Sequence, residues 1–172
     1  ALVSQSKSFE EVYELAKSKD TMLKCIPAIQ PVSNKDLKRL ASGFGMRIHP
    51  IYKSAKMHTG LDFTADIGTE IYATGDGVVE SIESKYSGYG QHVIINHGFG
   101  YESLYAHMSR VAVRPGQKVR RGQIIGYVGN TGTSTGPHLH YEVMKNGEKV
   151  DPSFYFYSDI TPEQYEDMLK RS

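Results

Sequence analysis

Histidines and carboxylates suited to chemistry gather in three short segments of this chain, residues 58–62, 104–109 and 136–140. In the last segment His138 and His140 are two positions apart, so on an extended strand both side chains project from the same face. Two protonated imidazoles at this spacing repel each other, and a divalent cation that keeps at least one ring neutral removes the repulsion. The pair therefore indicates a metal site, although two surface histidines on a strand would give the same pattern.

The first segment offers a nitrogen and an oxygen ligand, because His58 and Asp62 are four positions apart. Gly60 lies between them and allows the segment to bend so that both side chains converge. Nitrogen and oxygen donors of this kind suit zinc, and three protein ligands with one open position is the arrangement of catalytic zinc sites. A thiolate cluster is excluded, since Cys25 is the only cysteine; we interpret it as a small buried side chain.

Composition excludes several classes of protein. The 172 residues include 20 Lys or Arg and 19 Asp or Glu, so the formal net charge is +1 and nucleic acid is not an expected partner. With 39% hydrophobic and 23% charged residues, the chain is typical of a globular protein. No apolar stretch approaches the roughly 20 residues that are needed to cross a bilayer.

The first part of the chain predicts a helical arm over residues 1–42. Ser8 and Glu11 match a capping box, and apolar residues over 9 to about 24 fall near one helical face. Residues 33–36 can cap a second, shorter helix that stops at Gly43. Such short helices cannot form a core alone, so we expect them to pack on the body or on something outside this chain.

The rest of the chain predicts a mainly β body over residues 43–157 and a short C-terminal helix within 158–172. All 17 glycines lie between Gly43 and Gly147, and they separate runs of β-branched and aromatic residues. Such runs with turn signals between them indicate an antiparallel all-β fold. The six clearest runs are 70–73, 77–82, 91–96, 101–105, 123–128 and 139–143.

The three segments, in this order and together with residues 126–132 and 133–142, resemble the LytM/lysostaphin-type zinc metallopeptidases, which cut cell-wall peptide cross-bridges. The resemblance extends from about Gly43 to Phe154. It implies a barrel-like antiparallel β-sheet body of the duplicated hybrid motif kind. Glu70 and Met108 depart from the usual residues of the family, at positions that affect loop detail only.

The same resemblance assigns a role to five side chains. It implies that His58, Asp62 and His140 bind Zn²⁺, and that His107 and His138 are unligated catalytic histidines. Zinc lowers the pKa of a bound water toward about 7 and polarises a peptide carbonyl. A histidine with a pKa near 6.5 can then take up or return the proton. Which of the two histidines is the general base stays open.

By resemblance, the chain is expected to be a zinc metalloendopeptidase that hydrolyses peptide cross-links of bacterial peptidoglycan during cell-wall remodelling. Its partners would be peptidoglycan stem peptides and cross-bridges, and it would act in the cell envelope, outside the cytoplasmic membrane. The first helix could be the end of a membrane-anchored coil in a longer parent protein. The short loop at residues 53–57 favours a D-alanyl bond to a diamino acid over a glycine–glycine bond as the cleaved cross-link.

Tyrosine and the remaining histidines are weaker candidates. Tyr52 lies six residues before His58, and similar enzymes have an aromatic hydroxyl near the zinc that can hydrogen-bond an oxyanion. A half-packed structural tyrosine fits the sequence equally well. His49, His92 and His97 match no ligand spacing, and we interpret them as structural.

Three alternative functions stay open. A sugar-transport phosphocarrier of related barrel fold also uses paired histidines but needs no carboxylate ligand, so Asp62 counts against it. A biotinyl or lipoyl carrier would modify Lys145, which instead precedes a strong two-residue hairpin turn at Asn146 and Gly147. A non-hydrolytic, cell-wall-binding regulator of other hydrolases would have lost part of the ligand set. A separate hypothesis is that residues 1–42 fold across the groove and limit access to it.

Overall fold

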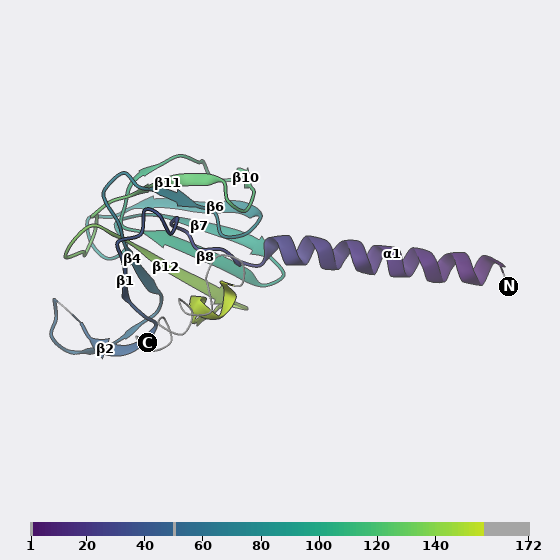
Figure 1. Cartoon of the computed structure of the whole chain (residues 1–172), viewed down its shortest axis with the longest axis horizontal. Helices are drawn as coiled ribbons and strands as arrows, with labels where there is room; N and C mark the ends of the chain where they lie inside the picture. Colours follow the sequence, from purple (N-terminus) through teal and green to yellow (C-terminus); the bar gives the residue numbers. More distant parts are fainter. Residues whose placement is uncertain (1, 50, 157–172) are drawn as a thin grey trace.

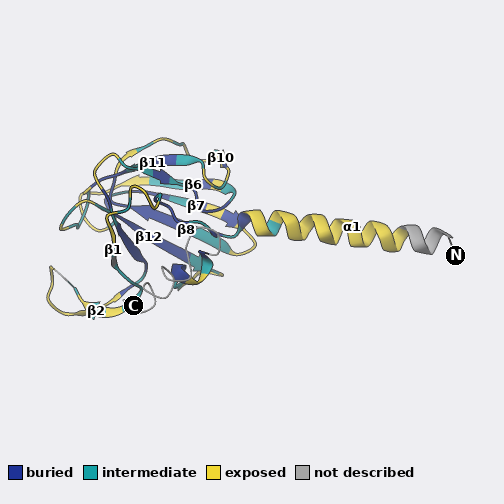
Figure 2. Ribbon diagram, viewed as in Figure 1, coloured by how far each residue is buried: buried dark blue, intermediate teal, exposed yellow. Residues whose placement is uncertain are grey.

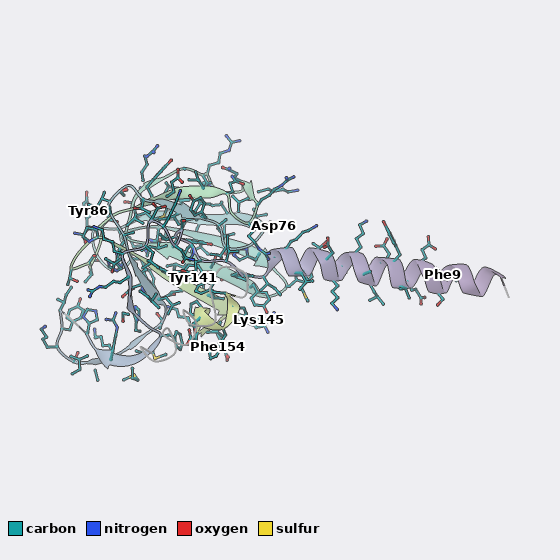
Figure 3. The ribbon with its side chains drawn as sticks, in the orientation of Figure 1. Phe9, Asp76, Tyr86, Tyr141, Lys145 and Phe154 are labelled. Atoms are coloured by element: carbon teal, nitrogen blue, oxygen red, sulfur yellow. The ribbon has the colours of Figure 1, made fainter. Side chains whose placement is uncertain are left out.

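The structure is a computed structural model that describes residues 2–49 and 51–156, and it consists of a β body from which one long helix projects (Figure 1). Helix α1 (Leu2–Cys25) begins earlier than the predicted helix. Every side chain from residue 7 to residue 21 is exposed (Figure 2), and Phe9 points into solvent (Figure 3). The helix therefore packs on the body only through its last turn.

The joint between α1 and the body is held by backbone carbonyls at the end of the helix. The guanidinium of Arg121 donates to the carbonyl oxygens of Lys24 at 3.1 Å and of Ile26 at 3.0 Å. The amide of Asp76, which lies at the base of the helix in Figure 3, donates to the Lys24 carbonyl at 2.9 Å. Cys25 is buried at this joint, as the sequence predicts.

The predicted second helix is wrong. Ser33 accepts a backbone hydrogen bond from Leu37 at 3.0 Å in a turn, and the chain then forms strand β1 (Arg39–Ser42), which pairs antiparallel with β4 (Leu61–Thr64). Pairing with a distant strand overrides the local helix signal at this position. Val32 is fully buried, so residues 26–42, which the sequence analysis assigned to the arm, pack into the body.

The strands of the described residues form three antiparallel sheets, as predicted for a mainly β fold, and each of the six predicted runs contains a strand. The main sheet has the order β1-β4-β12-β8-β7-β6-β10, with β13 paired to β12. Its other strands are β6 (Gly77–Ser84), β7 (Gln91–Gly98), β8 (Tyr101–Ala106), β10 (Lys118–Val119), β12 (His138–Lys145) and β13 (Glu148–Val150).

Two smaller sheets and a short 3-10 helix complete the body. The second sheet has the order β5-β11-β9, and the third is the hairpin β2-β3. These elements are β2 (Gly45–Ile48), β3 (Ala55–His58), β5 (Glu70–Tyr72), β9 (Met108–Val111), β11 (Ile124–Val128) and η1 (Pro152–Tyr155). The predicted C-terminal helix lies outside the described residues.

The core lies between the main sheet and the β5-β11-β9 sheet, whose apolar side chains form one buried cluster. On β12, Leu139, Tyr141 and Val143 are fully buried in this cluster, and Tyr141 lies inside the body in Figure 3. Because side chains alternate along a strand, His138 and His140 project from the opposite face of β12. Core packing therefore decides which face of the sheet carries the histidines.

Candidate metal centre and active site

Three side chains that the sequence analysis named as ligands converge on one point. His58 lies at the end of β3, Asp62 on β4 and His140 on β12, and all three are buried. The Nε2 of His58 is 3.2 Å from Oδ1 of Asp62 and 3.2 Å from Nδ1 of His140, and the latter two atoms are 2.8 Å apart. The group is therefore able to hold a metal ion.

Backbone packing brings these residues together. Asp62 and His140 are direct partners in the antiparallel pairing of β4 with β12. The turn between β3 and β4 carries Gly60, and a Cβ atom at this position would overlap the carbonyl oxygen of Tyr141 on β12. Only glycine allows the turn to approach the neighbouring strand this closely, and this approach places His58 beside the other two side chains.

The donor set fits a zinc ion. Tetrahedral ligands about 2.0 Å from zinc lie about 3.3 Å from one another, close to the separations found here. Nδ1 of His58 is 2.6 Å from the carbonyl oxygen of Gly43, and Nε2 of His140 is 3.0 Å from Oε1 of Glu142. Since these oxygens only accept, the neutral rings carry their protons there. Their two bare nitrogens therefore face Asp62, an arrangement that favours a cation.

The pKa values of the residues at the centre also favour a bound cation. Burial raises the pKa of Asp62, but hydrogen bonds with His140 and His58, which need a further proton on these rings, outweigh it and hold the pKa well below its ordinary value. Burial lowers the pKa of His140, whereas hydrogen bonds to Asp62 and Glu142 raise it, to about 9 overall. Positive charge is thus favoured inside the cluster, and either a proton or a metal ion can supply it.

His107 and His138 lie beside this cluster with their ring centroids 4.7 Å apart. Nδ1 of His107 is 2.7 Å from the Thr131 carbonyl oxygen, and Nδ1 of His138 is 2.8 Å from the Gly136 carbonyl oxygen. The Nε2 atom of His138 is 3.8 Å from Oδ1 of Asp62. Burial lowers the pKa of His107 to about 4. Both rings, when neutral, therefore keep a bare Nε2 next to the candidate metal site.

Glu142 is a site residue to which the sequence analysis assigned no role. It is fully buried, and besides His140 its Oε1 accepts from the hydroxyls of Thr59 at 2.5 Å and Tyr89 at 2.8 Å. Its Oε2 lies 3.0 Å from Nζ of Lys149. Burial raises the pKa of Glu142, but the bond to His140 and these further contacts lower it to about 2. Its spacing of two from His140 on one strand was the available signal.

The five histidine and aspartate candidates line a groove of about 750 Å³. One group of lining residues, here called the hairpin wall, comes from β1, β2, β3 and the turn between β2 and β3. A second group, here called the loop wall, consists of residues 87–89 and 133–137. Two hydrogen bonds hold the two loops together. The amide of Thr133 donates to the carbonyl oxygen of Gly88, and the amide of Gly88 donates to the hydroxyl of Thr133.

Tyr52 lies on the hairpin wall, with 58% of its surface exposed. Its ring packs 4.6 Å from the ring of His49, and Nζ of Lys56 lies 3.9 Å from its centroid. Nδ1 of His49 accepts the amides of Ile51 and Tyr52 in the hairpin turn, as expected of a structural histidine. A role for the Tyr52 hydroxyl in oxyanion binding stays a prediction.

The other two histidines set aside by the sequence analysis are buried away from the groove. His97 makes hydrogen bonds of 2.8 Å with the Asp76 carbonyl and 2.7 Å with the Ser103 hydroxyl, and burial lowers its pKa to about 4. His92 bonds the Gly90 carbonyl at 3.0 Å. Both have the hydrogen-bonded surroundings of structural histidines.

Helix α1 extends away from the side of the body that carries the β2-β3 hairpin (Figure 1). No described residue of α1 lines the groove, and the described residues of the predicted arm that do so are Arg39 and Ser42. Helix α1 therefore does not cross the groove. Within the described residues, no helix combines the length and apolar character needed to cross a membrane.

Comparison with known proteins identifies a family. Residues 56–152 match Peptidase family M23. The chain is 48% identical over 114 residues to DD-carboxypeptidase/endopeptidase Mpg of Neisseria meningitidis, covering 66% of this chain and 26% of that protein. It is 46% identical over 123 residues to peptidoglycan DD-endopeptidase ShyA of Vibrio cholerae, covering 70% and 28%. The chain thus spans about a quarter of the length of these relatives.

Solved structures agree with the sequence comparison. A zinc-containing peptidase from Vibrio cholerae superposes with a TM-score of 0.67 at 35% identity, over 78% of this chain and 41% of that one. The catalytic domain of lysostaphin from Staphylococcus simulans gives 0.64 at 33% identity, over 70% and 92%. The resemblance drawn from the sequence is confirmed. This chain belongs to peptidase family M23.

Proposed function

We propose that this protein is a zinc-dependent endopeptidase that hydrolyses peptide cross-links of bacterial peptidoglycan. The observation that carries the proposal is the convergence of His58 Nε2, Asp62 Oδ1 and His140 Nδ1 within one groove. Membership of family M23 supports it, as do relatives named peptidoglycan DD-endopeptidases. Action in the cell envelope follows from this substrate, and a membrane anchor in a longer parent protein stays a prediction.

His58, Asp62 and His140 would hold the zinc ion through the three converging atoms. When bound, zinc supplies a Lewis acid that activates water and polarises the peptide carbonyl. Glu142 keeps the His140 ring turned so that its Nδ1 faces the metal position. His107 and His138 line the same groove as the three ligands, and a peptide could reach the metal position through this groove.

His107 and His138 would move the protons of the hydrolysis. Each ring is held by an Nδ1–H bond to a backbone carbonyl, so Nε2 is the atom that exchanges a proton. One ring takes the proton of the attacking water, and the other, once protonated, stabilises the carbonyl oxygen or donates to the departing amine.

Elemental analysis followed by mass spectrometry of peptidoglycan fragments tests this function. We expect one zinc ion per chain. Incubation with the protein should cleave cross-linked fragments, a chelator should abolish this cleavage, and added zinc should restore it. A zinc-loaded protein that binds peptidoglycan without cleaving any cross-link would favour the regulator alternative. Phosphate transfer to a histidine without any peptide cleavage would instead favour the phosphocarrier.

A further inference from the structure

The two walls of the groove differ in charge. The hairpin wall carries Arg39 on β1, Arg47 on β2 and Lys56 on β3, whereas the loop wall contains no charged side chain. Among the described residues that line the groove, Asp62 is the only carboxylate. The sequence shows the same bias, since residues 37–61 contain Lys and Arg but neither Asp nor Glu. The groove therefore presents positive charge along one side of the candidate metal centre.

Part of this charge is not neutralised by the protein. Arg47 forms an ion pair with Asp62 at 3.3 Å. In the part of the chain that the structure describes, neither Arg39 nor Lys56 pairs with a carboxylate, and Lys56 instead lies over the ring of Tyr52. Burial lowers the pKa of the neighbouring His49, and the positive charges of Lys56 and Arg47 lower it further. Arg39 and Lys56 are thus exposed cations available to a ligand.

We propose that Arg39 and Lys56 determine substrate specificity by binding a carboxylate on the carbon next to the scissile amide nitrogen. The inference rests on the proposed function and names the kind of cross-link that the groove selects. A D-alanyl bond to a diamino acid can carry a free carboxylate on the carbon next to the cleaved amide nitrogen, whereas a glycine–glycine bridge carries none. Charge complementarity at the hairpin wall favours the anionic cross-link and gives no such gain to the neutral one.

The position of the two cations suits recognition more than catalysis. They lie on exposed strand positions at the wall of the groove, while the proton-transferring candidates His107 and His138 lie beside the ligands. An exposed charge pair contributes modestly, so we expect the two side chains together to be worth about tenfold in kcat/KM. The effect should fall mainly on KM and weaken as salt concentration rises, because ions screen exposed charges.

Two cross-linked peptides that differ only next to the scissile amide test the proposal, one with a carboxylate and one with a carboxamide. The zinc-loaded wild type should prefer the carboxylate by about tenfold, and Arg39→Gln with Lys56→Gln should remove most of this preference. Lys53→Gln is the matched control, since Lys53 is an exposed lysine in the turn before β3 but does not line the groove. Its preference should equal that of the wild type.

Equal kcat/KM for the two peptides, or a full preference that persists in the double variant, would overturn the proposal while leaving the peptidase function intact. Failure of the zinc-loaded wild type to cleave either peptide would instead contradict the proposed function. Fluorescence anisotropy with the zinc-loaded His107→Asn variant measures the affinity for each of the two peptides without interference from cleavage. Tighter binding of the carboxylate peptide that disappears when Arg39→Gln and Lys56→Gln are added to this variant would support the proposal. Equal binding of the two peptides would contradict it.

Discussion

The Nε2 atom of His140 lies 3.0 Å from the buried Oε1 atom of Glu142, on the side of the imidazole opposite Asp62. A carboxylate accepts but does not donate, so this contact places the ring proton on Nε2 and leaves the lone pair of Nδ1 for a metal. Tyr89 stacks on the same ring, with centroids 5.8 Å apart. The orientation of one candidate ligand is thus set by residues outside the ligand set.

Replacing Glu142 should weaken zinc binding without removing any ligand. We expect Glu142→Leu to lower zinc affinity by about 10- to 100-fold, because the His140 ring loses its orienting acceptor. Glu142→Gln keeps an oxygen acceptor and should lose less. Competition with a chromophoric chelator measures both affinities, and circular dichroism checks the fold. A folded Leu variant with wild-type affinity would show that the contact does not orient the ring.

Changes at Asp62 and His107 should separate metal binding from turnover. Asp62→Ala should lose zinc, whereas His107→Asn should keep zinc and lose about 10²- to 10⁴-fold in turnover. Asparagine is chosen because residue 107 has a φ of 60°, which asparagine tolerates better than alanine. Elemental analysis and a peptide cleavage assay measure the two properties. Loss of zinc from the His107 variant would move this residue into the ligand set.

Zinc affinity should depend on pH through His140. In the metal-free protein its pKa is about 9, so a proton competes with zinc at neutral pH and the affinity should rise by up to about tenfold per pH unit toward pH 9. The pKa of His140 in the folded protein lies above the ordinary 6.5 of the unfolded chain. Protonation of His140 therefore stabilises the metal-free fold in full below pH 6.5, and this stabilisation is lost as the pH rises through 9. Isothermal titration calorimetry from pH 6.5 to 9 in weakly chelating buffers measures the affinity. An affinity independent of pH over this range would contradict the assignment.

Gly60→Ala should destabilise the body. The added Cβ would overlap the backbone of Tyr141, which cannot move without disturbing β12, so we expect a loss of about 1–3 kcal/mol in the free energy of unfolding. Gly136→Ala is the control, because a Cβ there meets open space and its φ is not positive. Urea unfolding of the metal-free proteins compares them. Equal stability of the two variants would show that the turn can relax.

Deleting residues 1–20 should leave turnover unchanged. Helix α1 projects away from the side of the body that carries the β2-β3 hairpin (Figure 1), and no described residue of α1 lines the groove. The deletion keeps Cys25 and the carbonyls that Arg121 binds at the joint. Steady-state kinetics of the shortened and full chains make the comparison. A rise in kcat/KM after deletion would support the hypothesis that the arm restrains access.

Local pattern predicted six of the thirteen strands in the described residues but misplaced the segment before Gly43. Runs of β-branched residues between glycines carry their own signal, and the spacing of His138 and His140 places both on one face of any strand. Residues 39–42 carry no comparable signal, and they become β1 only because β4 offers hydrogen-bonding partners. A segment whose conformation depends on a distant strand cannot be assigned from its own residues.

By itself, the sequence determined the chemical types of the site, namely imidazole and carboxylate donors at spacings that suit zinc, and the antiparallel β character of the body. The family resemblance named His58, Asp62 and His140 together, but only the tertiary structure brings their donor atoms to one point, because His58 and His140 are 82 positions apart and are joined through the pairing of β4 with β12. The buried Glu142 behind His140 and the cationic hairpin wall arise in the same way. Strand pairing and core packing, which depend on the whole chain, turn scattered side chains into one groove.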